Sequence, residues 1–322
     1  MKENYEKQHK LALLNPYKSV VKVLEGEPDS YLVGIKNVAS IPNTLMHRLE
    51  KCGFSLHTID RKSQLAGRAV DTELINPITG RWMSGSSSGT AVNVFAGIND
   101  LGIGNDGGGS VLAPAICVNI IGFISKLIEA DRPQNLKTNT DGMVTGNSLG
   151  FLARKREILL KAIEGSIGLK PAADYGRVIA DRQYGNLKCE VQNFMDNKTD
   201  RQTLTPYLKN KLKECDVMIV TEGPVDAEGF GDSLFGHFDE RTKELQQKAN
   251  KGYLRVANTA EATALALPQR GLGMATLLMC ESTPEKVSRL LKAAEAIEDV
   301  HDELIERYFL DLDSYFWEEY HI

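Results

Sequence analysis

The sequence predicts an α/β fold built as one domain. Short β-type runs and amphipathic helical stretches are mixed along the whole chain, an order that produces a sheet with helices packed against it. Of the 322 residues, 42% are hydrophobic and 25% are charged, an ordinary globular composition. The sequence has no internal repeat and no low-complexity linker. We therefore expect a single domain over residues 1–322.

The first sixty residues are predicted to form three strands and two helices. Ser19–Leu24 and Tyr31–Ile35 are β-type runs of apolar residues. Asn43–Cys52 has apolar residues at helical spacing and is followed by Gly53, the usual residue after a helix end. Phe54–Ile59 is again β-type. A polar stretch that reads as a short helix comes before these elements.

The middle of the chain contains two unusual segments rich in glycine and serine. Ser84–Thr90 leads into an apolar helical stretch, Ala91–Ala96. The small-residue strand Leu101–Gly104 then leads into the second segment, Gly104–Ser110, and a further apolar stretch follows it. Each segment taken alone is typical of a loop.

The second half of the chain continues the mixture of elements. Thr283-Pro284-Glu285 is a strong helix start, with a capping threonine, proline at the first position and an acidic first turn. We expect the acidic, aromatic tail Tyr315–Tyr320 to pack on its own domain, although it could dock on a partner. The predicted helices are 149–164, 206–215, Ala260–Leu265 and Thr283–Leu310, and the predicted strands are Asp216–Val220 and Met274–Cys280.

Charge and cysteine usage exclude several classes of protein. The formal net charge of -5 argues against a nucleic-acid or anionic-membrane partner. The five cysteines are scattered and lack metal-binding spacing, so we expect free thiols, with Cys117 in the core, and neither metal nor cofactor. The N-terminus has no secretory pattern, and no apolar run approaches the roughly 20 residues that span a bilayer. These features predict a soluble, cytoplasmic protein.

The run Gly107-Gly108-Gly109-Ser110 has the composition of a site that stabilises negative charge. Three glycines let backbone N–H groups approach a ligand closely, and those donors could stabilise the oxyanion of a tetrahedral intermediate beside the serine hydroxyl. Two other interpretations stay open for this run alone. It could be a glycine turn with a helix-capping serine, or a loop that binds phosphate.

A serine nucleophile needs a base, which is most often histidine. The six histidines lie in no recognisable nucleophile–base motif, and His47, His57 and His301 look like surface positions. A lysine can serve instead if burial keeps it neutral. Lys36, just after the apolar run Leu32–Ile35, is the best candidate, although alone it would read as a surface lysine at a strand end.

Together these segments resemble the amidase-signature family, whose core reads roughly GGSSGGS…DTGGS…P. The corresponding residues here are Ser84–Thr90, Gly104–Ser110 and Ala113-Pro114-Ala115, within a core motif at 84–126. Ser86 and Ser110 are 24 residues apart, as in the family, and the segment around Lys36 looks like the family's lysine motif. Weaker resemblance extends over most of the chain.

The resemblance implies both a fold and a set of residue roles. The fold would be a central, mixed, twisted sheet with helices on both faces, trimmed at the N-terminus. Ser110 would be the nucleophile, Ser86 a bridging serine after a cis peptide bond, and Lys36 the final base. The expected oxyanion donors are the N–H groups of Gly107, Gly108 and Gly109, together with that of Ser110, and Ser87 and Asp106 are expected to hold the loops by hydrogen bonds.

The sequence also departs from the family pattern. Leu112 stands where the family has an arginine after the nucleophile, which makes a carboxylate anchor at that position less favourable. Gly107, Ser88 and Asn37 replace other residues that are usual in the family. These departures favour a narrow substrate range.

The leading hypothesis is hydrolysis of a small-molecule amide through an acyl-enzyme on Ser110. A second is transfer of the acyl group to an amine, or use of the released ammonia by a partner subunit. A third is a binding module without catalysis, since folds can outlive their function. The chain could act as a homodimer or with a partner subunit.

Overall fold

The computed structural model describes residues 2–64, 69–133, 136–138, 141–229, 231, 238–300 and 302–310. The strands are β1 (Val20–Val23), β2 (Tyr31–Lys36), β3 (Phe54–Asp60), β4 (Val70–Ile75), β5 (Trp82–Ser84), β6 (Leu101–Asp106), β7 (Ile121–Ser125), β8 (Lys137–Thr138), β9 (Val144–Thr145), β10 (Ser148–Ala153), β11 (Val178–Ala180), β12 (Glu190–Val191), β13 (Val217–Glu222), β14 (Ala262–Pro268) and β15 (Ala275–Glu281). The helices are α1 (Lys2–Leu14), α2 (Asn43–Glu50), α3 (Ser88–Phe95), α4 (Leu112–Cys117), α5 (Arg156–Ile167), α6 (Arg201–Lys213), α7 (Glu240–Gln247), α8 (Pro284–Glu295) and α9 (Glu303–Ile305), with short irregular turns η2 (Tyr253–Arg255) and η3 (Glu306–Leu310).

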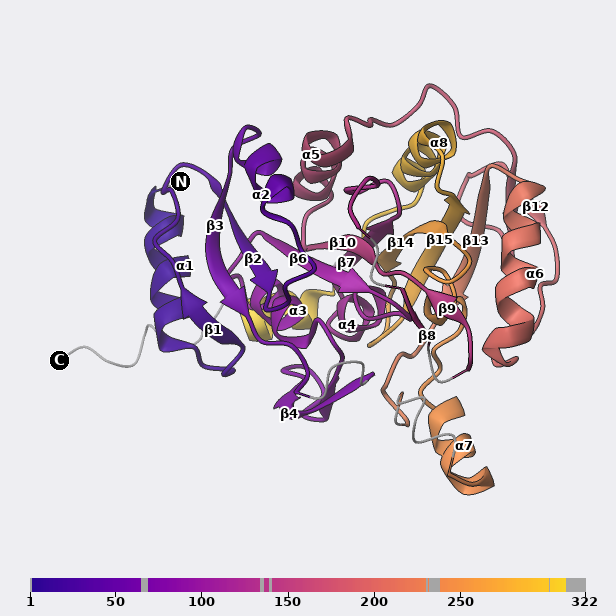
Figure 1. Ribbon diagram of the computed structural model, residues 1–322, viewed down its shortest axis with the longest axis horizontal. Coiled ribbons are helices and arrows are strands. Elements are labelled where there is room, and N and C mark those ends of the chain that lie inside the picture. The colour runs from indigo at the N-terminus through magenta and orange to yellow at the C-terminus, as the bar shows by residue number, and fades with distance from the viewer. Residues whose placement is uncertain are drawn as a thin grey trace.

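One mixed sheet of eleven strands runs through the described chain (Figure 1). Its strand order is β1-β3-β2-β6-β10-β7-β14-β15-β13-β11-β12. β2 pairs parallel with both β3 and β6, whereas each of the five pairs between β6 and β13 in this order is antiparallel. At the far end β11 is parallel to β12 and β13. The predicted α/β class with a central mixed sheet is confirmed.

Helices cover both faces of this sheet, and each face has its own apolar core. α3, α4 and α6 pack on one face, and α2, α5 and α8 pack on the other, where Figure 1 shows them along the top of the view. In β13, Met218 and Val220 join the first core, and Val217 and Ile219 join the second. Central strands are therefore apolar on both faces, which is why they read as continuous apolar runs in the sequence.

Three secondary-structure predictions for the second half are wrong in detail. Ala260–Leu265 was expected to be helical, but Ala262–Pro268 forms strand β14. Its alanines face one core and its leucines face the other, so tertiary packing overrides the helix propensity of alanine. The predicted helix at 149–164 begins instead as strand β10, and its helical part is α5.

The last predicted helix is also shorter than expected. α8 begins at Pro284 with Thr283 as its cap, as predicted, because the Thr283 side chain accepts a hydrogen bond from the Lys286 N–H. The helix ends at Glu295, and α9 and η3 follow as separate short turns. The tail Tyr315–Tyr320 lies outside the described residues.

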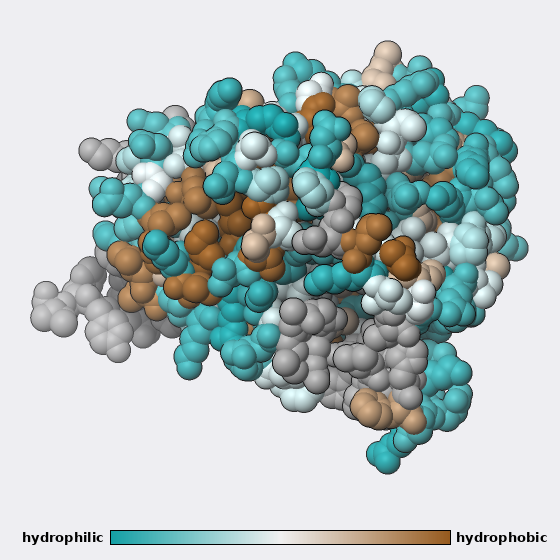
Figure 2. All heavy atoms as spheres, viewed as in Figure 1, coloured by the Kyte–Doolittle hydropathy of each residue, from teal (hydrophilic) through white to brown (hydrophobic). Residues whose placement is uncertain are grey.

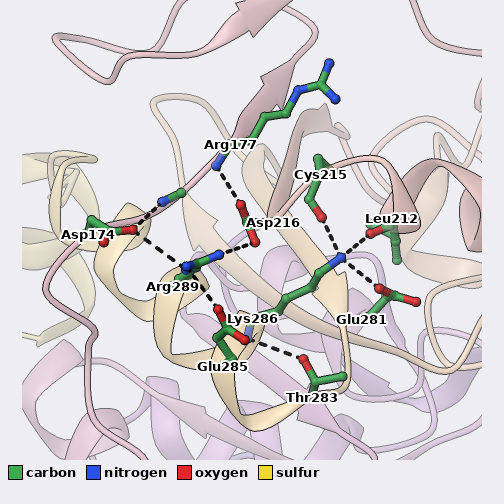
Figure 3. A network of polar contacts seen from close by, with 11 residues as sticks. Asp174, Arg177, Leu212, Cys215, Asp216, Glu281, Thr283, Glu285, Lys286 and Arg289 are labelled. Carbon is green, nitrogen blue, oxygen red and sulfur yellow. Dashed lines mark hydrogen bonds and ion pairs between the residues drawn. The ribbon is translucent and has the colours of Figure 1, made fainter.

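A polar network fixes α8 against the ends of α6 and β13 (Figure 3). Lys286 Nζ donates to the carbonyl oxygens of Leu212 and Cys215, at 2.8 and 2.7 Å, and to Glu281 Oε2 at 2.7 Å. A cation there complements the carbonyls at the C-terminal end of α6. Arg289 adds an ion pair of 2.6 Å with Asp216, which directly precedes β13.

Two glycines of β6 allow α3 to approach the sheet closely. A Cβ atom added at Gly102 would lie 2.5 Å from Thr90 Cγ2, and one at Gly104 would lie 2.6 Å from Ser87 Oγ. No larger residue fits at either position without moving α3. The N-terminal turn of α3 is therefore held against the end of β6, where the second glycine-rich segment begins.

Replacing Gly150 with alanine should destabilise the sheet next to these elements. Gly150 lies in β10 between β6 and β7, and an added Cβ would meet Phe123 O at 2.3 Å and Ile124 Cγ2 at 2.8 Å. We expect the free energy of unfolding to fall by about 1–3 kcal/mol, because the backbone must shift to relieve this overlap. Urea denaturation measures the change, and an unaltered midpoint would contradict it.

The surface of the molecule is mostly hydrophilic in the view of Figure 2, with an apolar area over β2 and β3. Among the described helices, none combines the length and apolar character needed to cross a membrane. All five cysteines are free thiols, and Cys117 is buried in the core, as predicted.

Candidate active site

Lys36 is the last residue of β2 and is only 3% exposed. Its Nζ donates to Ser86 Oγ at 2.6 Å and to the carbonyl oxygen of Asn105 at 3.4 Å. Burial disfavours the ammonium form and lowers the pKa of Lys36 to about 7, against the opposing effect of Asp106. A lysine with this pKa is partly neutral near pH 7 and can accept a proton.

Ser86 lies in the short connection between β5 and α3, and the Gly85–Ser86 peptide bond is cis, as the resemblance implied. Ser87 follows as the N-cap residue of α3. Its backbone N–H donates to the Ser110 carbonyl oxygen at 3.1 Å. This contact brings the two serine-rich segments together.

Ser87 was expected to hold the loops through hydrogen bonds, and it does so through its backbone. Its hydroxyl is buried against Gly104 and has no hydrogen-bond partner among the described residues. The side chain therefore acts here by filling the narrow space between α3 and β6.

Asp106 ends β6 and organises the glycine-rich loop. Its Oδ1 accepts the Gly109 N–H at 2.6 Å, and its Oδ2 accepts the N–H groups of Val111 and Leu112 at 2.6 and 3.3 Å. Burial raises the pKa of this carboxyl group, while the three N–H donors and Lys36 oppose that rise. The carboxyl group thus fixes the turn that carries Ser110.

These contacts correct one expectation. The N–H group of Gly109, predicted as an oxyanion donor, is directed inward to Asp106. In contrast, the N–H groups of Gly107, Gly108 and Ser110 make no hydrogen bond to other described residues, and all three residues are partly exposed. Three unused donors therefore remain around Ser110. Gly109 also has φ +101°, which requires glycine.

Ser110 is half-buried at the end of the loop. Among the hydrogen bonds of the described residues, none joins its hydroxyl to Ser86. The structure thus makes the Lys36–Ser86 contact directly and brings Ser110 alongside through the backbone of Ser87. Catalytic hydrogen bonds are often loose before substrate binds.

The described histidines lie elsewhere. His57 was expected at the surface but is buried, where it contacts Asn99 at 2.9 Å and His9 at 3.3 Å. His47 contacts Glu50. Among the described residues, Lys36 rather than a histidine is therefore the basic side chain that contacts Ser86. Among the described residues, no group of three or more His, Cys, Asp or Glu side chains could hold a metal ion.

Asn258 is a residue that sequence reasoning missed. It is fully buried, and its Nδ2 donates to the Gly107 carbonyl oxygen at 3.0 Å. Its Oδ1 accepts from Lys126 Nζ at 2.8 Å and from the Ser148 N–H at 2.9 Å. Asn258 therefore holds the glycine loop from a distant part of the chain, and one asparagine before a small-residue run gives no local signal of this role.

Comparisons with known proteins show which family this chain resembles. The Amidase family model matches residues 74–129, a range that contains Ser86 and Ser110. A curated protein of Synechocystis sp., described as "Putative amidase", is 34% identical over 105 residues. That region is 30% of this chain and 21% of the relative, so the match spans about a fifth of the relative's length. The resemblance to the amidase-signature family is confirmed.

Solved structures confirm the fold. A structure described as an amidase has a TM-score of 0.62 and 15% identity, and the match covers 92% of this chain and 95% of that one. The 6-aminohexanoate cyclic dimer hydrolase has a TM-score of 0.63 and 12% identity, with 92% and 93% covered. One subunit of the Glutamyl-tRNA(Gln) amidotransferase from Thermotoga maritima has a TM-score of 0.60 and 15% identity, with 92% of each chain covered. At these identities the likeness shows the fold, which is the amidase-signature fold.

Proposed function

We propose that this protein hydrolyses a carboxylic amide through an acyl-enzyme on Ser110, with Ser86 and Lys36 as the proton relay. The observation that carries the proposal is the 2.6 Å contact between Ser86 Oγ and a buried lysine whose pKa is lowered to about 7. The continuity of one sheet from β1 to β12 supports a single domain as the catalytic unit.

In the first half-reaction, the Ser110 hydroxyl oxygen attacks the amide carbonyl carbon. The Ser110 proton passes to Ser86 while the Ser86 proton passes to the neutral Lys36 amine, which becomes an ammonium. The N–H groups of Gly107, Gly108 and Ser110 stabilise the oxyanion that forms. The C–N bond then breaks, and the leaving amine takes the proton back through Ser86.

In the second half-reaction, water attacks the ester of Ser110. Its proton follows the same relay to Lys36. When the intermediate collapses, the C–O bond to Ser110 breaks, Lys36 returns the proton through Ser86 to the Ser110 oxygen, and a carboxylic acid is released. The Asp106 contacts support this route because they hold the loop in one geometry before substrate arrives.

Trapping the acyl-enzyme tests the proposal. The full chain is incubated with linear and cyclic amides and with activated esters, and its intact mass is measured by rapid quenching. We expect a mass increase equal to one acyl group, which peptide mapping assigns to Ser110. Label on another residue, or turnover through a noncovalent route, would refute this mechanism. Added hydroxylamine converts any acyl-enzyme to a hydroxamate, so the share of carboxylic acid that persists as its concentration rises shows how strongly the ester prefers water over an amine.

A further inference from the structure

A pocket lined by more basic than acidic side chains lies beside the glycine loop. Its volume is about 350 Å³, and its charged lining has five basic side chains against two acidic ones. This balance contrasts with the net charge of -5 for the whole chain. Clefts lined by one sign of charge attract ligands of the opposite sign.

One end of this pocket reaches the loop that carries Ser110. A Cβ atom added at Gly108 would lie 3.6 Å from both Nη1 and Nη2 of Arg201, and 3.6 Å from the carbonyl oxygen of Arg255. Arg201 is the first residue of α6, and Arg255 ends η2. Both arginines belong to the pocket lining. Arg201 therefore links the pocket to Gly108, one of the proposed oxyanion donors.

The two guanidinium groups are only partly neutralised by the protein. Arg201 Nη1 forms an ion pair of 3.3 Å with Asp141, and both side chains are mostly buried. Arg255 Nη2 donates to the carbonyl oxygens of Asn197 and Thr199, and Arg255 makes no ion pair with any described carboxylate.

The guanidinium group of Arg255 is also incompletely hydrogen-bonded. Its Nε is buried without a hydrogen-bond partner among the described residues. Burial, and then the charge of Arg201, lower the pKa of Arg255. Glu222, Asp141 and Asp200 partly offset this effect, and a bound anion would offset it further.

We propose that the acyl part of the substrate carries a carboxylate, bound by Arg201 and Arg255. This inference rests on the proposed function, since it places the carboxylate at the far end of the amide that Ser110 attacks. A planar carboxylate suits the guanidinium fork of Arg201, and Arg255 adds a second positive charge and its Nη1 group. The buried Leu112 supplies no charge near Ser110, so the cations come from α6 and η2 instead.

Matched substrates test the inference. The monoamides succinamate and glutaramate are compared with butyramide and pentanamide, in which a methyl group replaces the carboxylate. We expect kcat/KM to favour the charged amides by about 10- to 100-fold, the range of charge-assisted hydrogen bonds. Arg201→Gln should remove most of this preference, and Arg201→Lys should keep part of it. The exposed Arg270 provides the control, Arg270→Gln, which should retain it.

Binding of glutarate, measured by calorimetry without turnover, gives a separate readout. We expect binding that weakens at least about tenfold in Arg201→Gln and weakens with salt, but is unchanged in Arg270→Gln. Equal rates for charged and neutral amides, or binding that is insensitive to Arg201, would overturn the inference. A protein that binds glutarate through Arg201 but turns over no amide and forms no acyl-enzyme would refute the proposed function alone. Circular dichroism confirms that each variant is folded.

Discussion

Ser110→Ala should lower amide turnover by about 10⁴-fold or more and abolish labelling by a fluorophosphonate. Alanine removes the atom that forms the ester, and loss of the nucleophile in a relay removes nearly all chemical acceleration. The substitution should not disturb the loop, because the hydroxyl makes no hydrogen bond to another described residue, whereas the Ser110 carbonyl contact with Ser87 remains. Labelling is read by intact mass and turnover by released amine.

Ser288→Ala is a matched control for this prediction. Ser288 is a half-buried serine in α8 and lies outside the proposed site. Its variant should be labelled and turn over substrate like the wild-type protein. Persistent labelling of Ser110→Ala, at any residue and at the wild-type rate, would show that Ser110 is not the nucleophile.

Lys36→Met should lower kcat/KM by about 10³-fold or more and remove its pH dependence near neutrality. In the wild-type protein the neutral amine is the active form, so kcat/KM should rise with pH up to the Lys36 pKa of about 7 and then level off. Methionine keeps the length and apolar character of the side chain but cannot accept the Ser86 proton. A pH–rate profile of both proteins measures the effect.

The same variant should gain stability. The lowered Lys36 pKa means that the unfolded chain binds more protons than the native one between pH about 7 and the ordinary lysine value. Stability of the wild-type protein therefore rises with pH across that window, and below it the burial penalty is fully present. Lys36→Met should lack this slope, and near pH 6 it should unfold at a higher denaturant concentration than the wild-type protein.

The exposed Lys213 offers the control Lys213→Met, which should leave both the pH–rate profile and the pH dependence of stability unchanged. If kcat/KM of the wild-type protein does not change between pH 6 and 8, Lys36 is not the base.

The sequence predicted the α/β class and three residues that the fold brings to one place, because their motifs are local. Lys36 follows an apolar strand, and Ser86 and Ser110 lie in short glycine-rich segments at fixed spacing. The inward turn of the Gly109 N–H could not be predicted, since it depends on where the Asp106 carboxylate lies in three dimensions. The same glycine pattern is compatible with either direction of that N–H.

The residues that were missed reach the site through long-range contacts. Arg201, Arg255 and Asn258 lie about 90 to 150 positions after the loop and come from α6, η2 and the turn before β14. Nothing in the local pattern of these segments distinguishes them from surface cations or a turn asparagine. The misreading of Ala260–Leu265 as a helix also concealed that Asn258 lies just before a central strand.

Asn258 also limits how this chemistry could be transplanted. The Gly107 carbonyl is held by a side chain 151 positions later, and the lysine that contacts Ser86 lies 50 positions earlier. A designer who grafted only the segment 74–129 onto another scaffold would carry over both serines but neither support. A functional graft would therefore need β2, both glycine-rich segments and the turn before β14. These parts are far apart in the sequence, so no single continuous segment of the chain contains them all.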